Sequence, residues 1–557
     1  MLAVATAGAA LLVGPATATP KPPSTVPVRL VAINDFHGNL EPPTGSSGRI
    51  VDETGATVDA GGAAYLATHL KRLSNRDTLV VGAGDLIGAT PLISAAYHDE
   101  PTIEVMNKIG LDVASVGNHE FDEGYKELKR IQNGGCHPVD GCSPGGRYKG
   151  AEFTYLAANV LKDGLIDRWA LPPTAIKTIN GVKIGFIGLV TKTTPSIVTS
   201  SGIAGLKFID EVEAGNRAAK LLKAAGVKAM VALVHEGDQV TPNASPDACP
   251  VVPTVGTRIA RELSPDVDIV VMGHSHQAYL CRTQDPAGQD RVFTQGSSFG
   301  RVLTSIDFRI DKRTKDVVRS SVVADNHVVT RDVAPDPKIE KVVTAWRDRS
   351  AEVANRRIGT ITADIGRDPP TATGETPLGD LIADAQLESA REGGAVVALM
   401  NIGGVRAPLT YAQSGSEGDG VVTYGEAFTV QPFNNLVQVV SLTGAQLDAL
   451  LEQQWQNDGA LVRILQPSST LTYTMNLSRP IGDRVSDIKI NGEPISDTAT
   501  YRVAANNFLV GGGDGFTVFT QGTDLWSGPL DIDALVDYIA ARSPVAPPET
   551  NRITLAG

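Results

Sequence analysis

Short apolar runs alternate with segments of helical pattern over residues 27–310, and this alternation limits the possible fold more than any other feature. It predicts a layered α/β domain, in which helices cover buried strands. The chain has 557 residues, too many for one ordinary core, so we expect two or more domains. Six runs are interpreted as buried strands: PVRLVAI, DTLVVGA, LDVASV, VKIGFIGLV, KAMVALV and VDIVVM.

Five of these runs end in polar residues of one chemical kind. Ligands bind at the carboxyl ends of strands in an open α/β sheet, so five separate loops are expected to meet there. A single Gly-Asp or Gly-Asn-His is usually only a turn, but five such endings in one domain favour a shared function. The candidate ligands are Asp35, His37, Asp85, Asn118, His235, His274 and His276.

The chemistry of these side chains indicates metal ions. Carboxylate, amide and imidazole ligands suit borderline-to-hard divalent ions, and no thiolate is among the candidates. Seven ligands are too many for one tetrahedral ion, whereas they suit two ions that share a bridging carboxylate. The sequence therefore predicts a site for two divalent metal ions, with Zn, Mn, Co, Fe and Ca all left open.

The series D-x-H, G-D, G-N-H-E, H and G-H-x-H resembles the signature of the calcineurin-like metallophosphoesterases. Together with the second half of the chain, GNHEFD and GHSH resemble the 5′-nucleotidase family, which includes secreted UDP-sugar hydrolases and 2′,3′-cyclic-nucleotide phosphodiesterases. The resemblance covers residues 27–557 and implies an α/β fold in three parts. These are a four-layer αββα metallophosphoesterase domain (27–335), a linker helix (336–356) and a C-terminal α/β substrate-recognition domain (357–557). The linker is interpreted as solvated because its apolar positions are spaced helically between charged ones.

The same resemblance implies a role for each candidate. His119 and Asp122 of GNHEFD would form a catalytic pair, in which the imidazole contacts the phosphate and the carboxylate orients the imidazole. A neighbouring carboxylate raises the pKa of a histidine, and a cationic histidine stabilises charge that develops on phosphoryl oxygens. Asp85 would bridge the ions, because only a carboxylate among these ligands can partly neutralise two cations. One ion would be held by Asp35, His37, Asp85 and His276, and the other by Asp85, Asn118, His235 and His274.

The second domain would supply the substrate contacts. NIGGVR resembles the family's N-x-G-G-x-R segment, which implies that Asn401 and Arg406 bind substrate, and an arginine fork suits phosphate oxygens. Phe433 and Phe508 come from separate loops and could sandwich a nucleobase, while Asp514 could accept hydrogen bonds from ribose hydroxyls. The alternative is that these rings belong to the core and that GGGDG is only a turn.

One segment departs from the family pattern. Relatives often carry an additional Arg just before the residues that match ETPLGD, where this chain has TATG at residues 371–374. Arg367 is close in sequence but is not at the matching position. The preference for nucleoside monophosphates is therefore left open.

The N-terminal segment is typical of an exported protein. MLAVATAGAALLVGPATATP resembles a secretory signal peptide with a cleavage site after Ala18, and a Pro-rich tether follows, so residues 1–26 are assigned to these two segments. A spanning helix is the alternative, but Gly14, Pro15 and the short apolar length count against it. We expect no transmembrane anchor in the mature chain and a secreted or extracytoplasmic location, either periplasmic or associated with the cell wall.

Four cysteines also fit an exported protein, with two disulfides. Sequence proximity favours Cys136–Cys142, which leaves Cys249–Cys281, although three connectivities are formally possible. A zinc site made of four thiolates is the rival interpretation, but these cysteines lack the C-x2-C spacing of such sites.

The leading prediction is a secreted two-metal phosphohydrolase that removes phosphate from nucleotides by attack of metal-activated water. The alternatives are a 2′,3′-cyclic-nucleotide phosphodiesterase/3′-nucleotidase, a UDP-sugar hydrolase, a nucleotide-binding surface protein and a periplasmic-type solute-binding protein. The two binding proteins have no need of seven metal ligands. A net charge of −13 counts against binding of DNA or RNA. The oligomeric state is left open, and four other histidines are predicted to be structural or solvent-exposed: His69, His98, His137 and His327.

Overall fold

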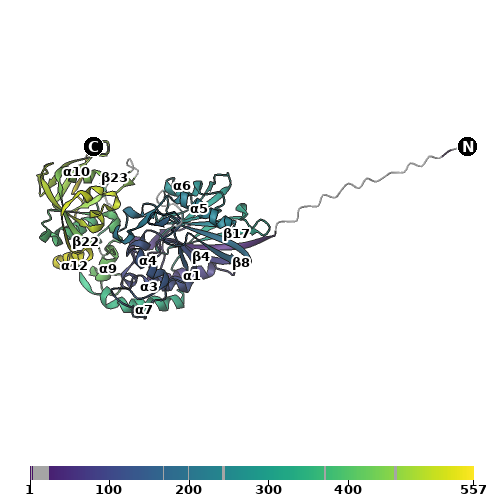
Figure 1. Ribbon diagram of the computed structural model, residues 1–557. Helices are drawn as coiled ribbons and strands as arrows, with labels where there is room; N and C mark the ends of the chain where they lie inside the picture. The colour runs from purple at the N-terminus through teal and green to yellow at the C-terminus, as the bar shows by residue number, and fades with distance from the viewer. Residues whose placement is uncertain are drawn as a thin grey trace.

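The chain folds into two α/β domains, drawn in purple to teal and in green to yellow in Figure 1. The computed structural model describes residues 1, 3, 24–166, 168–198, 200–240, 245–368, 372–433, 435–456 and 461–556. Apart from residues 1 and 3, the predicted signal peptide therefore lies outside the described residues, as does most of the tether. Within the described residues, no helix combines the length and the apolar character that crossing a membrane requires.

Two six-stranded sheets form the centre of the first domain. In the first sheet, β1 lies between β17, which is antiparallel to it, and β4, which is parallel. The strand order of this sheet is β18 (Val323–Val328), β17 (Val302–Asp311), β1 (Thr25–Ile33), β4 (Thr78–Ala83), β5 (Leu111–Ser115) and β6 (Thr154–Leu156). The order of the second sheet is β15 (Ala278–Gln284), β16 (Asp290–Gly296), β14 (Ile269–Met272), β11 (Ala229–His235), β9 (Val182–Val190) and β8 (Thr174–Ile179).

The two sheets pack face to face, and helices cover their outer faces. Leu30 and Val81 of the first sheet share one buried cluster with Phe186 and Val231 of the second. The first sheet is covered by α1 (Ala63–Leu73), α3 (Glu100–Ile109) and α4 (Tyr125–Asn133), and the second by α5 (Glu211–Ala224) and α6 (Val255–Glu262). Figure 1 shows these two helical layers on opposite sides of the strands. The expected four-layer αββα domain is thus confirmed.

All six apolar runs form strands, and the layered packing explains their composition. Every residue of β11 is buried, because one face of its sheet meets the other sheet and the other face meets helices. A strand covered on both faces shows a continuous apolar run rather than an alternation.

The predicted linker helix is α7 (Pro337–Ala354). Asp336 caps it, since its side chain accepts hydrogen bonds from the backbone N–H groups of Lys338 and Ile339. The sequence had indicated a solvated helix, but one face of α7 is buried. Trp346 is buried on its inner face and donates from Nε1 to Glu104 of α3 at 2.9 Å, so α7 is fixed along the first domain.

The second domain contains a five-stranded and a four-stranded sheet. The first has the order β25 (Leu465–Pro467), β20 (Val397–Asn401), β29 (Thr500–Asn506), β22 (Leu436–Thr443) and β30 (Thr523–Leu530). The second has the order β28 (Glu493–Pro494), β27 (Val485–Ile490), β26 (Leu471–Met475) and β31 (Ile553–Leu555). The helices that pack on them include α8 (Pro377–Ser389), α10 (Gly444–Glu452) and α12 (Asp531–Arg542).

The segment SLTGAQLDALLEQQWQ has a helical pattern but is helical over only part of its length. Its first residues end β22, and Thr443 then starts α10 through a capping box with Gln446. Trp455 and Gln456 form β23 after the helix ends. The capping signal inside the segment marks where the strand gives way to the helix.

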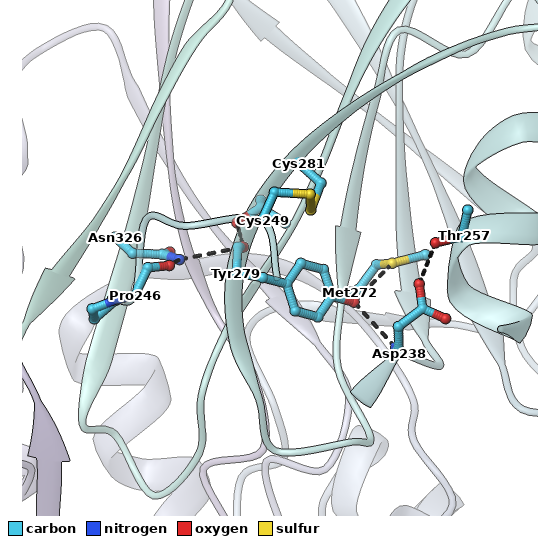
Figure 2. The surroundings of a disulfide bond; sticks show 9 residues. Asp238, Pro246, Cys249, Thr257, Met272, Tyr279, Cys281 and Asn326 are labelled. Carbon is cyan, nitrogen blue, oxygen red and sulfur yellow. Dashed lines mark hydrogen bonds between the residues drawn. A yellow bond between two sulfur atoms is a disulfide. The ribbon is translucent and has the colours of Figure 1, made fainter. Parts of the chain in front are cut away.

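Both expected disulfides are present, Cys136–Cys142 and Cys249–Cys281. Cys281 lies on β15, and Figure 2 shows Tyr279 of the same strand reaching toward Met272. The Tyr279 hydroxyl donates to Met272 Sδ at 3.3 Å. Met272 ends β14 just before the GHSH segment, and β16 lies between β14 and β15 in the sheet. The strand that carries Cys281 therefore reaches the strand that presents His274 and His276 through the Tyr279 hydroxyl.

Candidate metal centre and substrate pocket

The five predicted loops meet at one end of the two central sheets. Three of them follow β1, β4 and β5 of the first sheet, and two follow β11 and β14 of the second. The parallel pairing of β1 with β4, β4 with β5 and β11 with β14 puts their carboxyl ends together. Each predicted ligand is therefore at a strand end, and His235 is itself the last residue of β11.

The ligand atoms form two adjoining groups. Asp85 Oδ2 lies 2.9 Å from Nε2 of His235 and 3.7 Å from Nε2 of His37. Asp35 Oδ1 lies 3.4 Å from Nε2 of His276, and the Nε2 atoms of His276 and His37 are 3.2 Å apart. Ligand atoms lie within 4.8 Å of one another in the group Asp35, His37 and His276 and in the group Asp85, His235 and His274.

Left-handed backbone recurs at the ligands. A non-glycine residue with positive φ is uncommon, although Asp and His tolerate it better than most, and each such residue costs roughly 1–3 kcal/mol. Strain of this kind persists where the surrounding structure fixes the backbone, and it clusters at functional sites. The ligands concerned are Asp35 (φ 47°), His37 (46°), Asp85 (49°), His274 (72°) and His276 (59°).

Glu120 is one of the groups that fix this backbone. Its buried carboxylate accepts hydrogen bonds from the backbone N–H groups of Asp85 at 3.0 Å, of Leu86 at 2.8 Å and of Gly117. A Cβ at Gly117 would lie 2.1 Å from Asp85 Oδ1, so glycine is required there. Glu120 therefore holds the loops after β4 and β5 against each other, with Asp85 between them.

The buried charges of the cluster perturb one another. Burial raises the pKa of Asp35 to about 7 and lowers that of His37 to about 3. For Asp85, burial alone would raise the pKa, but His235 and His119 hold it well below its usual range. Burial opposes protonation of His235, yet the Asp85 carboxylate outweighs it and raises this pKa to about 10.

These residues fit two divalent ions. Carboxylates and imidazoles crowded in an apolar surrounding need compensating charge, and divalent cations are the strongest local charges that proteins use. Asn118 supplies a further sign, because its buried Oδ1 has no hydrogen-bond partner among the described residues although it lines the pocket. An amide oxygen of this kind suits a hard or borderline cation.

His119 and Asp122 are paired as the sequence predicted. Nδ1 of His119 and Oδ2 of Asp122 are 2.8 Å apart, which leaves the other ring nitrogen for a substrate. Burial opposes protonation of His119, but the charges of Asp122 and Asp85 raise its pKa above the usual value. Burial likewise raises the pKa of Asp122, against the effect of His119.

The second domain contributes the opposite wall of the pocket. The ring of Phe433 stacks at 5.7 Å from the ring of His119, with 22° between the planes. The guanidinium carbon of Arg406 lies 5.8 Å from the centre of the same Phe433 ring. Phe433 and Arg406 thus face the pair of His119 and Asp122 across the domain boundary.

A hydrogen-bonded network extends this wall. Asn401 donates from Nδ2 to Asp514 Oδ2 at 2.8 Å, and Asn506 donates from Nδ2 to Asn401 Oδ1 at 3.0 Å. Arg463 lies 3.3 Å from Asp514 Oδ1. The five predicted substrate residues line one pocket together with Asn118, His119, Asp122 and His274 of the first domain.

Several residues of the site carried no prediction. Asn435 and Asn506 line the pocket and lie inside the segments QPFNN and NNFLVGGGDGF, so closer attention to those motifs could have found them. Arg463 belongs to no motif in the sequence. Arg367 donates from Nη1 to the carbonyl oxygen of Arg406 at 2.9 Å, which brings its guanidinium beside the predicted phosphate contact.

The four other histidines lie outside this pocket. His69 contacts the carbonyl oxygen of Thr330 at 3.0 Å, and His327 contacts Ser305 Oγ at 2.8 Å. His98 and His137 stack on each other, with ring centres 3.7 Å apart.

Comparison with known proteins places each domain. Residues 28–278 match the family model of the calcineurin-like phosphoesterases, and residues 357–521 match that of the 5′-nucleotidase C-terminal domain. A cell wall protein of Listeria monocytogenes is 35% identical over 92% of this chain and 67% of its own length. The endonuclease YhcR of Bacillus subtilis is 31% identical over 96% of this chain, which spans 41% of that longer protein.

A solved structure agrees with both matches. The 5′-nucleotidase precursor of Thermus thermophilus superposes with a TM-score of 0.76 and 27% identity, over 95% of this chain and 99% of its own. The first domain is a calcineurin-like phosphoesterase, a class of enzymes that bind divalent metals. The whole chain belongs to the 5′-nucleotidase family of phosphoester hydrolases, as the sequence motifs had indicated.

Proposed function

We propose that this protein is an extracytoplasmic phosphohydrolase that removes phosphate from nucleotides with the aid of two divalent metal ions. One observation carries the proposal. His119 and its partner Asp122 lie between the seven predicted metal ligands and the Phe433 and Arg406 side chains of the second domain. A phosphoryl group near His119 would therefore meet the ions on one side and the remainder of a nucleotide would meet the second domain on the other.

Different residues of the chain would have different roles in the reaction. His119, oriented by Asp122, would donate a hydrogen bond to a phosphoryl oxygen as negative charge develops there. Arg406 would hold another oxygen through its planar fork. When bound, two divalent ions would supply Lewis-acid charge for the phosphoryl group and acidify the attacking water. Asp35, His37, Asp85 and His276 would hold one ion, and Asp85, Asn118, His235 and His274 the other.

The second domain would recognise the nucleoside. Phe433 and Phe508 line the same pocket and could each stack on a base. Stacking depends little on which base is bound, so this site would accept different nucleotides. Asp514 is held by Asn401 at 2.8 Å and would accept hydrogen bonds from ribose hydroxyls. The ring of Phe508 lies over Gly513, where a Cβ would come within 2.6 Å of it, so the glycine-rich turn makes room for this aromatic.

A 2′,3′-cyclic-nucleotide phosphodiesterase/3′-nucleotidase is the second candidate. Arg463 favours it, because this guanidinium lies 3.3 Å from Asp514 and supplies a cation at the end of the pocket assigned to the ribose. A phosphate on the ribose 2′ or 3′ oxygen would meet this charge. A 5′-phosphate alone would not require it.

Export from the cytoplasm is part of the proposal. Both disulfides and the relative described as a cell wall protein support a location outside the cytoplasm. The test is the fate of the N-terminus in the source cells, where the mature chain should begin after Ala18 and be found outside the cytoplasmic fraction. A full-length chain in the cytoplasm would contradict this location.

The activity is tested with a panel of substrates. AMP, UDP-glucose and 2′,3′-cyclic AMP should be compared with added Mn²⁺, Zn²⁺, Co²⁺ or Ca²⁺, with Asp85→Ala as the control for contaminating phosphatases. We expect release of phosphate from AMP and loss of this activity in the variant. Hydrolysis of 2′,3′-cyclic AMP or UDP-glucose in preference to AMP would select one of the alternative enzymes. Binding of nucleotides without turnover under every metal condition would make the protein a nucleotide-binding surface protein.

A further inference from the structure

A second cluster of metal-binding side chains lies on the surface of the first domain, away from the substrate pocket. His98 follows the short helix α2 (Leu92–Ala95), Glu123 follows the catalytic loop, and His137 and Asp140 belong to the loop closed by the disulfide Cys136–Cys142. His98 Nδ1 lies 2.9 Å from Glu123 Oε2, and its Nε2 lies 2.9 Å from Asp140 Oδ2.

The cluster brings four potential ligands to one place. Asp140 Oδ2 is also 3.0 Å from His137 Nδ1. Ligand atoms of His98, Glu123 and His137 lie within 4.8 Å of one another. The other two histidines outside the pocket, His69 and His327, belong to no such group among the described residues. Two imidazoles and two carboxylates form a donor set typical of zinc and related ions.

The backbone around His98 is held in place. His98 and Asp99 both have left-handed backbone, with φ of 51° and 60°. The Asp99 carboxylate accepts hydrogen bonds from Ser94 Oγ at 2.7 Å and from the N–H of Gly88 at 3.1 Å. Such strain persists only where neighbouring contacts enforce it, and it is most common at functional sites.

The disulfide restrains the partner loop. Cys136 and Cys142 close a loop that contains His137 and Asp140, so fewer conformations are lost when these side chains bind an ion. The two imidazole rings now stack with 17° between their planes. Binding requires one ring to tilt so that a nitrogen of each points at the ion. His137, on the surface loop, is the ring we expect to move.

We propose that His98, Glu123, His137 and Asp140 form a third metal site, which takes one divalent transition-metal ion of borderline softness such as Zn²⁺. The ion would join three segments that ion pairs and ring stacking already link. Arg130 also connects two of them, since its Nη1 donates to Glu100 and to the carbonyl oxygen of Gly135. Glu123 directly follows Asp122, the carboxylate that orients His119. Occupation of the site therefore fixes the end of the catalytic loop to the disulfide loop, and its role is to stabilise the first domain rather than to take part in the reaction.

The test counts ions in matched variants. His137→Ala and Glu123→Gln are compared with the wild type and with His327→Ala, a control that removes a histidine outside any cluster. Each purified protein is dialysed against the same buffered micromolar free Zn²⁺, and zinc per chain is measured by elemental analysis. Because ions in the substrate pocket contribute equally to every sample, the difference between samples does not depend on the proposed function.

We expect both cluster variants to hold one zinc ion fewer per chain than the wild type, and the control to match the wild type. Zn²⁺ should also raise the melting temperature of the wild type more than that of either cluster variant. Equal zinc content in the wild type and in a folded cluster variant would overturn the proposal. Glu123→Gln gives the same answer if His137→Ala does not fold, because it leaves the disulfide loop unchanged.

Discussion

The two walls of the pocket differ in how their polar side chains are balanced. The wall of the first domain crowds carboxylates and imidazoles within 4.8 Å, and several of these residues have strained left-handed backbone. The wall of the second domain satisfies its polar groups internally, as in the chain from Asn506 to Asn401 to Asp514. The first wall requires cations to balance its charges, whereas the second is already organised to receive a polar substrate.

This contrast predicts that the two walls fail in different ways when side chains are removed. Loss of a metal ligand should affect ion content and chemistry together, because the charges of the cluster depend on one another. Loss of a recognition residue should affect binding of one part of the substrate and leave the ions in place. The following predictions are ordered from the largest expected effect to the smallest.

Asp85→Ala should give the largest effect. Asp85 lies between the two ligand groups, at 2.9 Å from His235 and 3.7 Å from His37, so its removal should release both ions and lower kcat by at least about 10³-fold. Metal analysis and phosphate release are measured on the same preparation. Asp514→Asn is the matched control from the other wall and should keep both ions. An Asp85→Ala protein that retains two ions would refute the bridging role.

The His119→Ala variant should retain both metal ions but have a much lower kcat. His119 Nδ1 is 2.8 Å from Asp122 Oδ2. One ligand atom of His119 also lies within 4.8 Å of those of His37 and Asp85, but His119 is not among the seven predicted ligands. Its removal should therefore lower kcat by about 10²–10⁴-fold with little change in KM. Single-turnover kinetics with nucleotide in excess of KM separate this loss from a binding defect. Metal loss equal to that of Asp85→Ala would show that His119 is a ligand and not a substrate contact.

Phe433→Ala should weaken binding of the base alone. One stacked base is worth about 1–3 kcal/mol, which corresponds to a rise in KM of roughly 5- to 150-fold. The matched comparison is a phosphate ester without an aromatic group, such as ribose 5-phosphate, whose KM should not change. An equal rise for both substrates would mean that Phe433 acts through the neighbouring His119 ring, which stacks on it at 5.7 Å.

The layered fold and the ligand positions could be predicted from the sequence because both depend on short-range pattern. A strand covered on both faces leaves a continuous apolar run, and a ligand at its carboxyl end is adjacent to it in the chain. His235 and Asp85 illustrate this, since each lies within two residues of the end of a strand. The buried face of α7 was missed because the positions facing the first domain, such as Trp346, are spaced among many charged residues.

The supporting contacts could not be predicted, because they join residues far apart in the chain. Glu120 holds Asp85 through backbone N–H groups, which have no sequence signature. Arg463 reaches Asp514 from a strand pair with no recognisable motif. Left-handed backbone at Asp35 and His37 is imposed by tertiary hydrogen bonds such as that from the N–H of Asp35 to Gly84. Each of these features is a property of the assembled loops.

Arg367→Ala should have the smallest effect of the substitutions considered, and it tests whether the second wall also needs a bound anion. Burial, followed by the charge of Arg367, lowers the pKa of Arg406 to about 10, so the second wall also contains like charges that an anion would relieve. Arg367 holds the Arg406 carbonyl at 2.9 Å, and Arg367→Ala should raise KM for AMP about fivefold, the effect of roughly 1 kcal/mol. Inhibition by inorganic phosphate should weaken by the same factor, because the phosphate group is the part of the substrate that would interact with Arg367 and Arg406. Arg406→Ala should have a larger effect on both measurements. Unchanged inhibition by phosphate in Arg367→Ala would show that Arg367 only supports the loop, and that the second wall balances its charges without an anion.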